Sequence, residues 1–197
     1  MDLNMMRNIL RRDLRDEDPA NYRWSDDELD RHIAHAVKEF SEAVPLPAEA
    51  TLPTTPGSRV IDISALADRV MVEAVEYPLD RFPPAYQRFA LWGHALTLFG
   101  DEVPDGASCI VYYGMLHTLD GQGSSVPTKH EDLIAIGAEG YAAVGWAGYA
   151  INKVSLGGTT TPGEFLNWGN QKLKQFRSEL RRLGRKNQVR IRQLYKL

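Results

Sequence analysis

Two histidines three residues apart, His32 and His35, are the side chains of this sequence best spaced to hold a metal ion. They lie in the stretch YRWSDDELDRHIAHAVKEFSEAV, residues 22–44, where a helix would bring both imidazoles to one face. Such a pair can share a zinc ion when a third ligand is available. The sequence offers no obvious third ligand and no metalloprotease-type glutamate between them. We therefore interpret both as polar contact residues, and we expect no metal and no cofactor.

The other reactive side chains form no recognisable catalytic arrangement. His117 and Asp120 flank the end of an expected strand, His130 precedes two acids that a helix start explains, and Cys109 reads as a small buried hydrophobe. The sequence contains no nucleophile elbow, no Walker loop and no dinucleotide-binding glycine motif. We expect that the protein is not an enzyme.

The cysteine count and the first residues indicate the cellular setting. A single cysteine excludes an internal disulfide and a cysteine-rich zinc site. The stretch MDLNMMRNILRRDLRDEDP carries charges throughout and lacks the apolar core of a signal peptide. These features predict synthesis in a reducing intracellular environment.

A capping box positions the histidine-bearing helix. In Ser25-Asp-Asp-Glu28, the side chains of Ser25 and Glu28 can each bond the other's backbone amide. Apolar residues at three- and four-residue steps continue this helix to the next proline, and a similar pattern predicts an earlier helix over residues 3–16. We expect these two helices to be antiparallel, with Tyr22 and Trp24 anchoring the loop between them.

Beyond the second helix the periodicity changes to that of strands. The proline-rich residues 45–57 predict a rigid, extended connection. Four runs that alternate in polarity or are rich in aromatic and β-branched residues follow, namely 59–63, 69–77, 86–99 and 108–116. They predict a small antiparallel sheet of about four strands.

A second pair of helices is expected after the sheet. Thr128 with Glu131 and Thr161 with Glu164 form two further capping boxes. Between them, residues 130–153 are rich in small side chains. Glycine costs about 1 kcal/mol in a helix interior, so its repeated use indicates close helix contact, within one subunit or around a ring. The residues expected to make this contact are Gly137, Gly140, Ala143, Gly145 and Gly148. The segment is too weakly apolar, with Glu139 inside it, to predict a membrane span.

Charge is divided unequally along the chain. Residues 172–197 contain ten basic residues and one acid, a net charge of +9, so with a total of −3 the first 171 residues carry −12. Apolar and basic side chains alternate near the C-terminus, as in a strand that adds to a partner's sheet. This alternation predicts an extended binding arm made by Arg185, Lys186, Val189, Arg190, Ile191, Arg192, Leu194 and Tyr195. Binding of nucleic acid through phosphate contacts is the alternative, and disorder of the free arm fits both.

These patterns together predict an α+β fold. We expect an antiparallel bundle of about four helices, formed by residues 1–45 and 128–183. A small antiparallel β insertion, residues 58–118, would lie between the second and third helices, and residues 184–197 would form an extended basic C-terminal arm. The hydrophobic content of 43% and charged content of 25% are those of an ordinary globular protein with a buried core.

Several short motifs occur in a recognisable order along the chain. They are the helix ending in Leu10–Leu14, the helix start Trp24-Ser-Asp-Asp-Glu-Leu29, Tyr77-Pro78, Pro84-x-Tyr86-x-x-Phe89, and the helix from Leu133-Ile-Ala to Trp146-Ala147. In motif and order the chain resembles the head–tail connector, or adaptor, proteins of tailed bacteriophages. In that family a helix pair opening with a W-S-D-x-E-L type start precedes a β-containing insertion and two more helices. The resemblance covers most of the chain in architecture and the first 45 residues in motif.

The resemblance implies a structural protein of the virion without catalysis. Members of the family form a ring, commonly of twelve subunits, beneath the portal of the DNA-filled head. Their C-terminal segments dock onto the portal, and the opposite face receives the stopper, nozzle or tail. By this resemblance residues 184–197 would bind the portal, and the acidic remainder would surround the channel through which DNA is ejected. The protein would assemble in the host cytoplasm and reside in the neck of the virion. The alternative is a DNA-binding protein that uses the basic residues 172–197.

Overall fold

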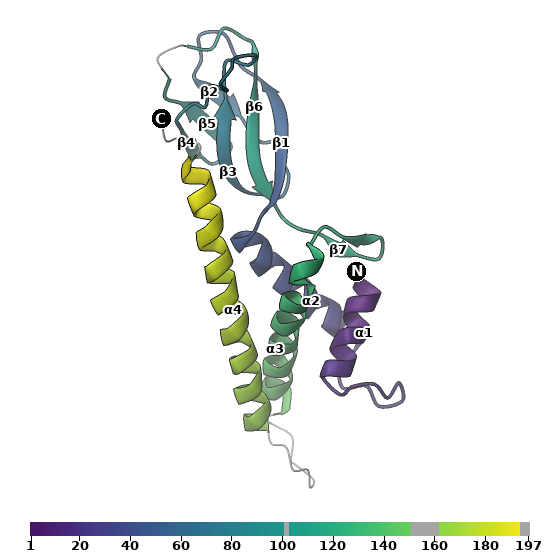
Figure 1. The fold of residues 1–197 in the computed structure, drawn as a ribbon. Coiled ribbons are helices and arrows are strands. Elements are labelled where there is room, and N and C mark those ends of the chain that lie inside the picture. Colours follow the sequence, from purple (N-terminus) through teal and green to yellow (C-terminus); the bar gives the residue numbers. More distant parts are fainter. Residues whose placement is uncertain (101–102, 151–161, 194–197) are drawn as a thin grey trace. The chain divides into compact units, whose positions relative to one another are not determined.

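The computed structural model describes residues 1–100, 103–150 and 162–193 (Figure 1). The chain divides into two compact units. The helical unit comprises Met1–Val44 and His117–Gly184, and the β unit is built on Pro45–Leu116. The β unit is therefore inserted between the two segments that form the helical unit.

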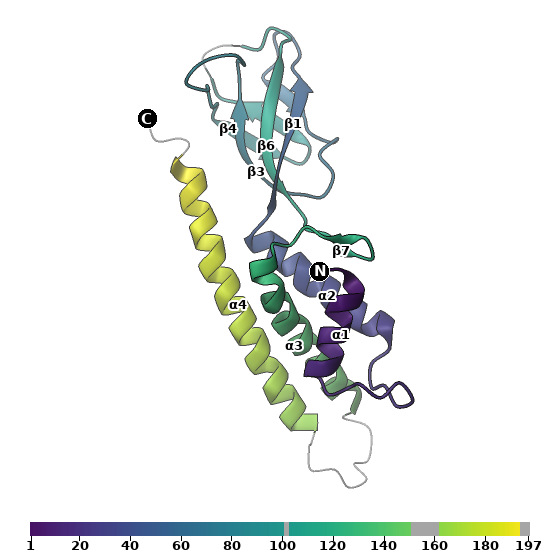
Figure 2. The ribbon, with the colours of Figure 1, turned by 45° about the vertical axis from the view of Figure 1, so that its right-hand side comes forward.

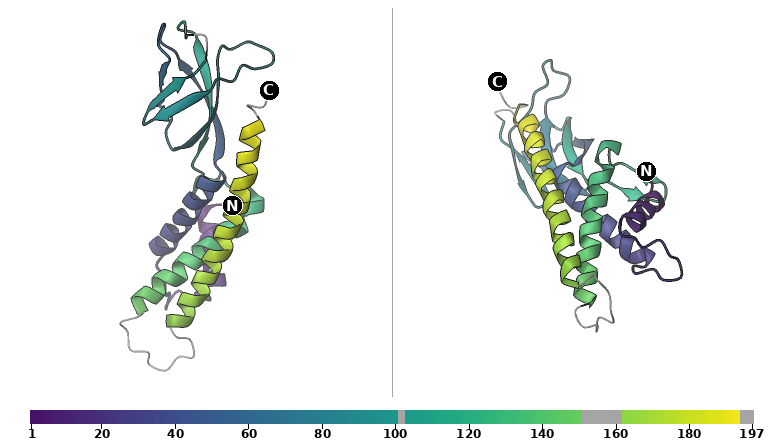
Figure 3. Two further views of the ribbon diagram at one scale, coloured as in Figure 1. Left: turned by 90° about the vertical axis from the view of Figure 1, so that its left-hand side faces the viewer. Right: turned by 60° about the horizontal axis from the view of Figure 1, so that its bottom comes forward.

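Among its described residues, the helical unit contains four helices, a 3-10 turn and a short hairpin. They are α1 (Leu3–Asp13), α2 (Asp26–Ala43), β7 (Leu119–Asp120), β8 (Gly123–Ser124), the 3-10 turn Thr128–His130, α3 (Glu131–Ala150) and α4 (Pro162–Gln193), which continues past Gly184. Helix α3 contacts α1 and α2, and α4 runs beside it in both views of Figure 3. Helix α3 is apolar on nearly every side, as expected for a helix surrounded by others.

The core of the helical unit joins all four helices. Met6 and Leu10 of α1, Phe40 of α2, Ile134 of α3 and Phe176 of α4 are fully buried in one cluster. Burying a side chain of this size contributes about 1.5–3 kcal/mol each to folding. The residues that form this core follow the three- and four-residue spacing seen in the sequence, because that spacing places them on one helical face.

The β unit contains two three-stranded antiparallel sheets (Figure 2). One has the strand order β1-β6-β3 and the other the order β2-β5-β4. The strands are β1 (Leu46–Pro53), β2 (Val60–Asp62), β3 (Arg69–Glu76), β4 (Phe89–Trp92), β5 (Ala95–Leu98) and β6 (Ser108–Met115). Their inward-facing residues form a second core that includes Ile61, Val75, Leu96 and Val111.

The described part of the chain is α+β with four helices, but the predicted bundle of four helices with one small β insertion is wrong. Three antiparallel sheets occur in the described residues, and those of the β unit form a substantial body with its own core. The main error lies at residues 45–57, which we predicted to be a rigid, extended connection outside the sheet. Residues 46–53 instead form β1, which pairs with β6 from Leu46↔Met115 to Pro53↔Ser108. The prolines are tolerated because β1 is an edge strand, where a missing N–H can face away from the sheet.

Two further expectations are corrected by the element boundaries. Residues 86–99 do not form one long strand, because a turn at Gly93, with φ of +58°, separates β4 from β5. The predicted extended arm begins as a helix, since α4 continues through Gly184 to Gln193. One glycine costs a helix about 1 kcal/mol, and the flanking arginine, lysine, leucine and glutamine residues are favourable helix formers.

Candidate interaction surfaces

The small residues of α3 pack against α4 of the same chain. A Cβ atom added at Gly137 would lie 2.9 Å from the ring of Phe176, and one at Gly140 would lie 2.8 Å from Leu173 Cγ. The buried side chain of Ala143 would lie 3.0 Å from a Cβ added at Gly169 of α4. The glycines are thus needed where the two helices approach most closely.

The other two predicted packing glycines have different surroundings. A Cβ atom at Gly145 would lie 3.4 Å from the ring of His32, so this glycine faces α2. A Cβ at Gly148 would meet no atom of the described residues within 4 Å. Of the five predicted packing residues, Gly148 is therefore the one for which contact with another subunit remains a prediction.

The two histidines of α2 lie at the α2–α3 contact. Burial lowers the pKa of His32 to about 4, so this imidazole is neutral at physiological pH. The His35 ring stacks on Tyr141 with centroids 4.0 Å apart, and its Nε2 lies 4.0 Å from Glu39. In the part of the chain that the structure describes, no group of three or more metal-ligating side chains is found.

His117 holds a structural position at the start of the second segment of the helical unit. Its backbone N–H donates to Ser41 Oγ at 2.9 Å, and its ring Nε2 lies 3.0 Å from the Val44 carbonyl oxygen. Ring Nδ1 lies 3.1 Å from Ser125 Oγ, and burial lowers the pKa of the imidazole. The Asp120 carboxylate instead accepts from the backbone amides of Gln122 and Gly123 in its own turn. Both residues therefore fix local structure.

The predicted helix caps have three different outcomes. Ser25 and Glu28 form the reciprocal capping box, with bonds of 3.3 Å and 2.8 Å. Thr128 makes no side-chain cap, because Pro127 precedes a 3-10 turn there, and Glu131 instead accepts from the Met1 ammonium at 3.0 Å. Thr161 lies outside the described residues.

Sequence reasoning missed a buried arginine that organises the loop before α2. Arg11 donates to Asp16 at 2.8 Å, to Asp26 at 2.6 Å and to the Trp24 carbonyl at 3.2 Å. Its guanidinium also lies 3.5 Å from the centroid of the Tyr22 ring. The loop is held further by Trp24, which is buried and whose indole N–H donates to the carbonyl of Ala142 in α3. Several arginines in this part of the sequence lie near acidic residues. The sequence therefore does not indicate which of them is buried.

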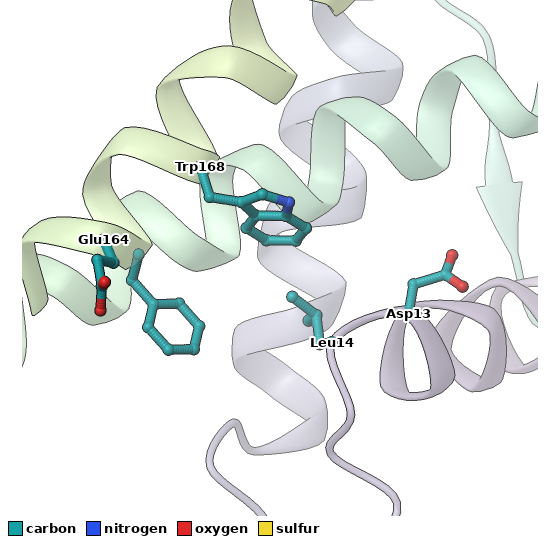
Figure 4. Close-up of a pocket in the computed structure, with 5 residues that line it drawn as sticks. Asp13, Leu14, Glu164 and Trp168 are labelled. Atoms are coloured by element: carbon teal, nitrogen blue, oxygen red, sulfur yellow. The ribbon is translucent and has the colours of Figure 1, made fainter. Parts of the chain in front are cut away.

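An open groove with a volume of about 290 Å³ lies between the C-terminal end of α1 and the first turns of α4. It is lined by Asp13, Leu14, Glu164, Phe165 and Trp168. In Figure 4, Trp168 and Leu14 extend toward each other, with Glu164 and Asp13 on opposite sides of them. Glu164, predicted as a helix cap, is thus one of the two acids beside an apolar groove.

Charged side chains are concentrated around this groove. Lys172 Nζ lies 2.7 Å from the carboxylate of Glu139, which is almost completely buried, and 5.3 Å from the centroid of the Trp168 ring. Burial raises the pKa of Glu139, and a hydrogen-bonding contact with Asp13 acts in the same direction. Arg23 lies 5.0 Å from the ring centroid of Phe165. The buried Glu139 is therefore paired with Lys172 next to Trp168, one of the residues that line the groove.

The outer face of α4 is basic. Leu173, Phe176 and Leu180 are buried on its inner side. The exposed basic residues of the described side chains are Lys174, Arg177, Arg181, Arg182, Arg185 and Lys186. Of the predicted arm, Arg185 to Arg192 lie in the helix, and Leu194 and Tyr195 lie outside the described residues.

The β unit exposes large apolar side chains. Phe82, in the loop between β3 and β4, is 99% exposed, and Trp92, at the end of β4, is 89% exposed. Exposed aromatic residues of this kind often serve as anchors in protein–protein interfaces. Cys109 is buried in the core of this unit, where burial raises the pKa of its thiol.

Among the helices of the described residues, none combines the length and apolar composition that a membrane crossing requires. Comparison with known proteins gives no family: no protein-family model matches the chain, and no curated protein sequence matches it significantly.

Proposed function

We propose that this chain is a structural subunit of a ring that joins the portal of a phage head to the tail. The proposal starts from the resemblance to head–tail adaptors in the sequence. The observation that carries it further is the separation of charge: the exposed face of α4 is basic, whereas residues 1–171 carry a net charge of −12. Opposite charges on different surfaces of one chain favour association of one copy's basic face with the next copy's acidic face.

An association of this kind is heterologous, because the two contacting surfaces differ. Heterologous contacts generate a closed ring when the rotation between copies closes, and a filament when it does not. The proposed ring surrounds the DNA channel, where an acidic wall repels phosphate and limits adhesion during ejection. The ring assembles in the host cytoplasm and becomes part of the virion neck.

The proposed partners follow from the same resemblance to head–tail adaptors. The portal contacts the C-terminal segment, including Arg185 and Lys186, and the stopper, nozzle or tail protein contacts the opposite face of the ring. DNA passes through the ring without sequence-specific recognition. The proposal includes no catalysis and no cofactor.

The test is to measure the mass of the purified chain by light scattering after size exclusion, and to image it by negative stain. We expect a closed ring at low ionic strength that dissociates as salt rises, because the Debye length falls from about 30 Å at 0.01 M to about 10 Å at 0.1 M. Addition of the portal protein should stabilise the ring. A chain that stays monomeric at high concentration, with and without the portal, would refute the proposal.

The exposed basic face of α4 also favours a second candidate, a DNA-binding protein. Phosphate contacts would make the affinity fall steeply with salt, with a slope of about −0.9 per neutralised phosphate. Reversing the charge at Lys174, Arg181 and Arg185 should then abolish DNA retention in a gel shift. An unchanged gel shift would eliminate this candidate, and it would leave the ring proposal intact.

A further inference from the structure

The groove between α1 and α4 suits a single side chain better than a free ligand. Its volume of about 290 Å³ is just below the range of about 300–1,000 Å³ found for small-molecule sites. Leu14, Phe165 and Trp168 supply its apolar surface, and Asp13 and Glu164 supply its acids. A long side chain with an apolar stem and a positive end matches both features.

Arginine fits this surface better than lysine does. The planar guanidinium stacks on aromatic rings and bonds carboxylates in a fixed fork, which an ammonium group cannot do. One ring of this groove already makes an arginine contact within the chain, since Arg23 lies 5.0 Å from the ring centroid of Phe165.

The charges around the groove also favour a positive group. Asp13 lines the groove and helps to raise the pKa of the buried Glu139 carboxyl group, which is paired with Lys172. Lys172 offsets the charge of Glu139, and Asp13 supplies an acid on this side of the groove. Glu164 adds a second carboxylate on the other side of the groove. An incoming guanidinium would lie between these two negative ends.

We propose that the groove receives an arginine side chain from α4 of a second copy of this chain. Charge complementarity identifies this source, because the exposed face of α4 contains Arg177, Arg181, Arg182 and Arg185. A copy cannot fill its own groove with these residues. Arg181 follows Trp168 on one continuous helix, which at 1.5 Å per residue places it roughly 20 Å away.

The contact is directional. It joins the N-terminal end of α4 in one copy to the middle of α4 in the next, so two different surfaces meet. This inference rests on the proposed function, because it names one contact between neighbouring copies of the ring. Arg185 also belongs to the segment proposed to contact the portal, so the experiments on this contact are done without the portal protein.

The first experiment reverses the charge of the groove in the full chain. We expect Asp13→Lys/Glu164→Lys to weaken self-association, measured by sedimentation or native mass spectrometry, by about tenfold or more. Adding Arg181→Glu/Arg185→Glu should restore association, because the swapped charges again attract. The control Asp27→Lys/Glu42→Lys makes the same charge change at two exposed positions of α2 and should leave association close to wild type. Far-UV circular dichroism checks that each variant is folded.

The second experiment separates the groove from the ring. A peptide of residues 177–187, RSELRRLGRKN, is titrated into the full chain while its tryptophan fluorescence is recorded. We expect saturable binding that is lost in Asp13→Lys/Glu164→Lys and in the peptide RSELQQLGQKN.

The outcomes are distinguishable. A wild-type ring that is unaffected by the groove variant overturns this inference and leaves the proposed function standing. An open oligomer, such as a dimer or a filament, that the groove variant dissociates supports the inference and refutes the ring. Equal binding of both peptides, or of the peptide to the groove variant, overturns the inference in either case.

Discussion

The helical unit and the β unit differ in how they use buried charge. In the described residues, the helical unit buries Arg11, Asp16, Glu131 and Glu139, whereas the β unit buries Glu76 alone among charged side chains. The β unit is held chiefly by two sheets closing over an apolar core. The helical unit adds charged groups that fix a loop and the contact between helices. A buried ion pair contributes little net stability, but breaking one leaves an unpaired charge. The helical unit should therefore be the more sensitive to single polar substitutions and to pH.

The strongest test of this difference is Arg11→Met. We expect a loss of about 3–5 kcal/mol in the free energy of unfolding, because the Asp16 carboxylate stays buried without its cation. Denaturant titration followed by tryptophan fluorescence suits the measurement, since Trp24, Trp146 and Trp168 all lie in the helical unit. Arg12→Met, at an exposed neighbouring position, is the control and should change stability by less than about 0.5 kcal/mol. Equal losses for the two variants would contradict the role assigned to Arg11.

A cavity in the core of the β unit should lower its free energy of unfolding by nearly as much. This loss should not depend on charged groups. Leu96 is fully buried in the second core, together with Ile61 and Leu98. We expect Leu96→Ala to destabilise the β unit by about 2–5 kcal/mol, by the same amount at acidic and neutral pH. Hydrogen exchange of the β-unit amides measures this, and Leu91→Ala, a more exposed position on the adjacent strand, is the control. A loss that varied with pH would weaken the comparison between the units.

Two glycines of α3 should respond in opposite directions to the same substitution. Gly140→Ala places a methyl group 2.8 Å from Leu173 and 3.1 Å from the Gly169 carbonyl, and we expect a loss of about 1–3 kcal/mol. Gly148→Ala meets no described atom within 4 Å and should gain up to about 1 kcal/mol from helix propensity. Thermal unfolding of the two variants measures both changes. Stabilisation by Gly140→Ala would show that the two helices are less closely packed than the structure indicates.

The smallest expected effect is a pH dependence that arises at Glu139. Burial raises the pKa of this carboxyl group, with Asp13 adding to the rise and Lys172 opposing it. The folded chain thus binds the proton more tightly than the unfolded chain does. This contribution to stability is present at low pH and is lost as pH rises from the unfolded pKa through the folded pKa. Glu139→Gln removes the titrating group. The free energy of unfolding of this variant should therefore fall less than that of wild type as pH rises.

Urea unfolding of both proteins between about pH 5 and pH 8 measures this difference. Lys172→Met provides a second comparison, because without the opposing cation the fall with rising pH should become steeper. Parallel curves for wild type and Glu139→Gln would show that this carboxyl group does not contribute to the pH dependence.

Local sequence patterns predicted the positions of the described helices, although α4 continues past its predicted end at Gly184 to Gln193. The spacing of Leu29, Ile33 and Phe40 defines a helical face, and the Ser25–Glu28 capping box is present because it needs only residues three positions apart. The sheets were predicted less well. Prolines argued against a strand at residues 46–53, and only pairing with β6, far along the chain, makes β1 an edge strand.

The candidate site was hardly predictable at all. Asp13 and Leu14 are separated from Glu164, Phe165 and Trp168 by some 150 residues, and only helix packing brings them to one groove. Glu164 was expected to cap a helix and Glu139 only to interrupt an apolar segment. Neither expectation gave a reason to place them beside Trp168 or Lys172.

The sequence by itself determined the helical faces, the α2 cap and the division of charge between residues 1–171 and 172–197, because each depends on side chains near one another in the chain. Only the tertiary structure decided that Arg11 is buried, that Gly137 and Gly140 face α4, and that two acids flank an aromatic groove. These features depend on which helix faces meet, and that choice is made by the whole core at once, through contacts between residues far apart in sequence.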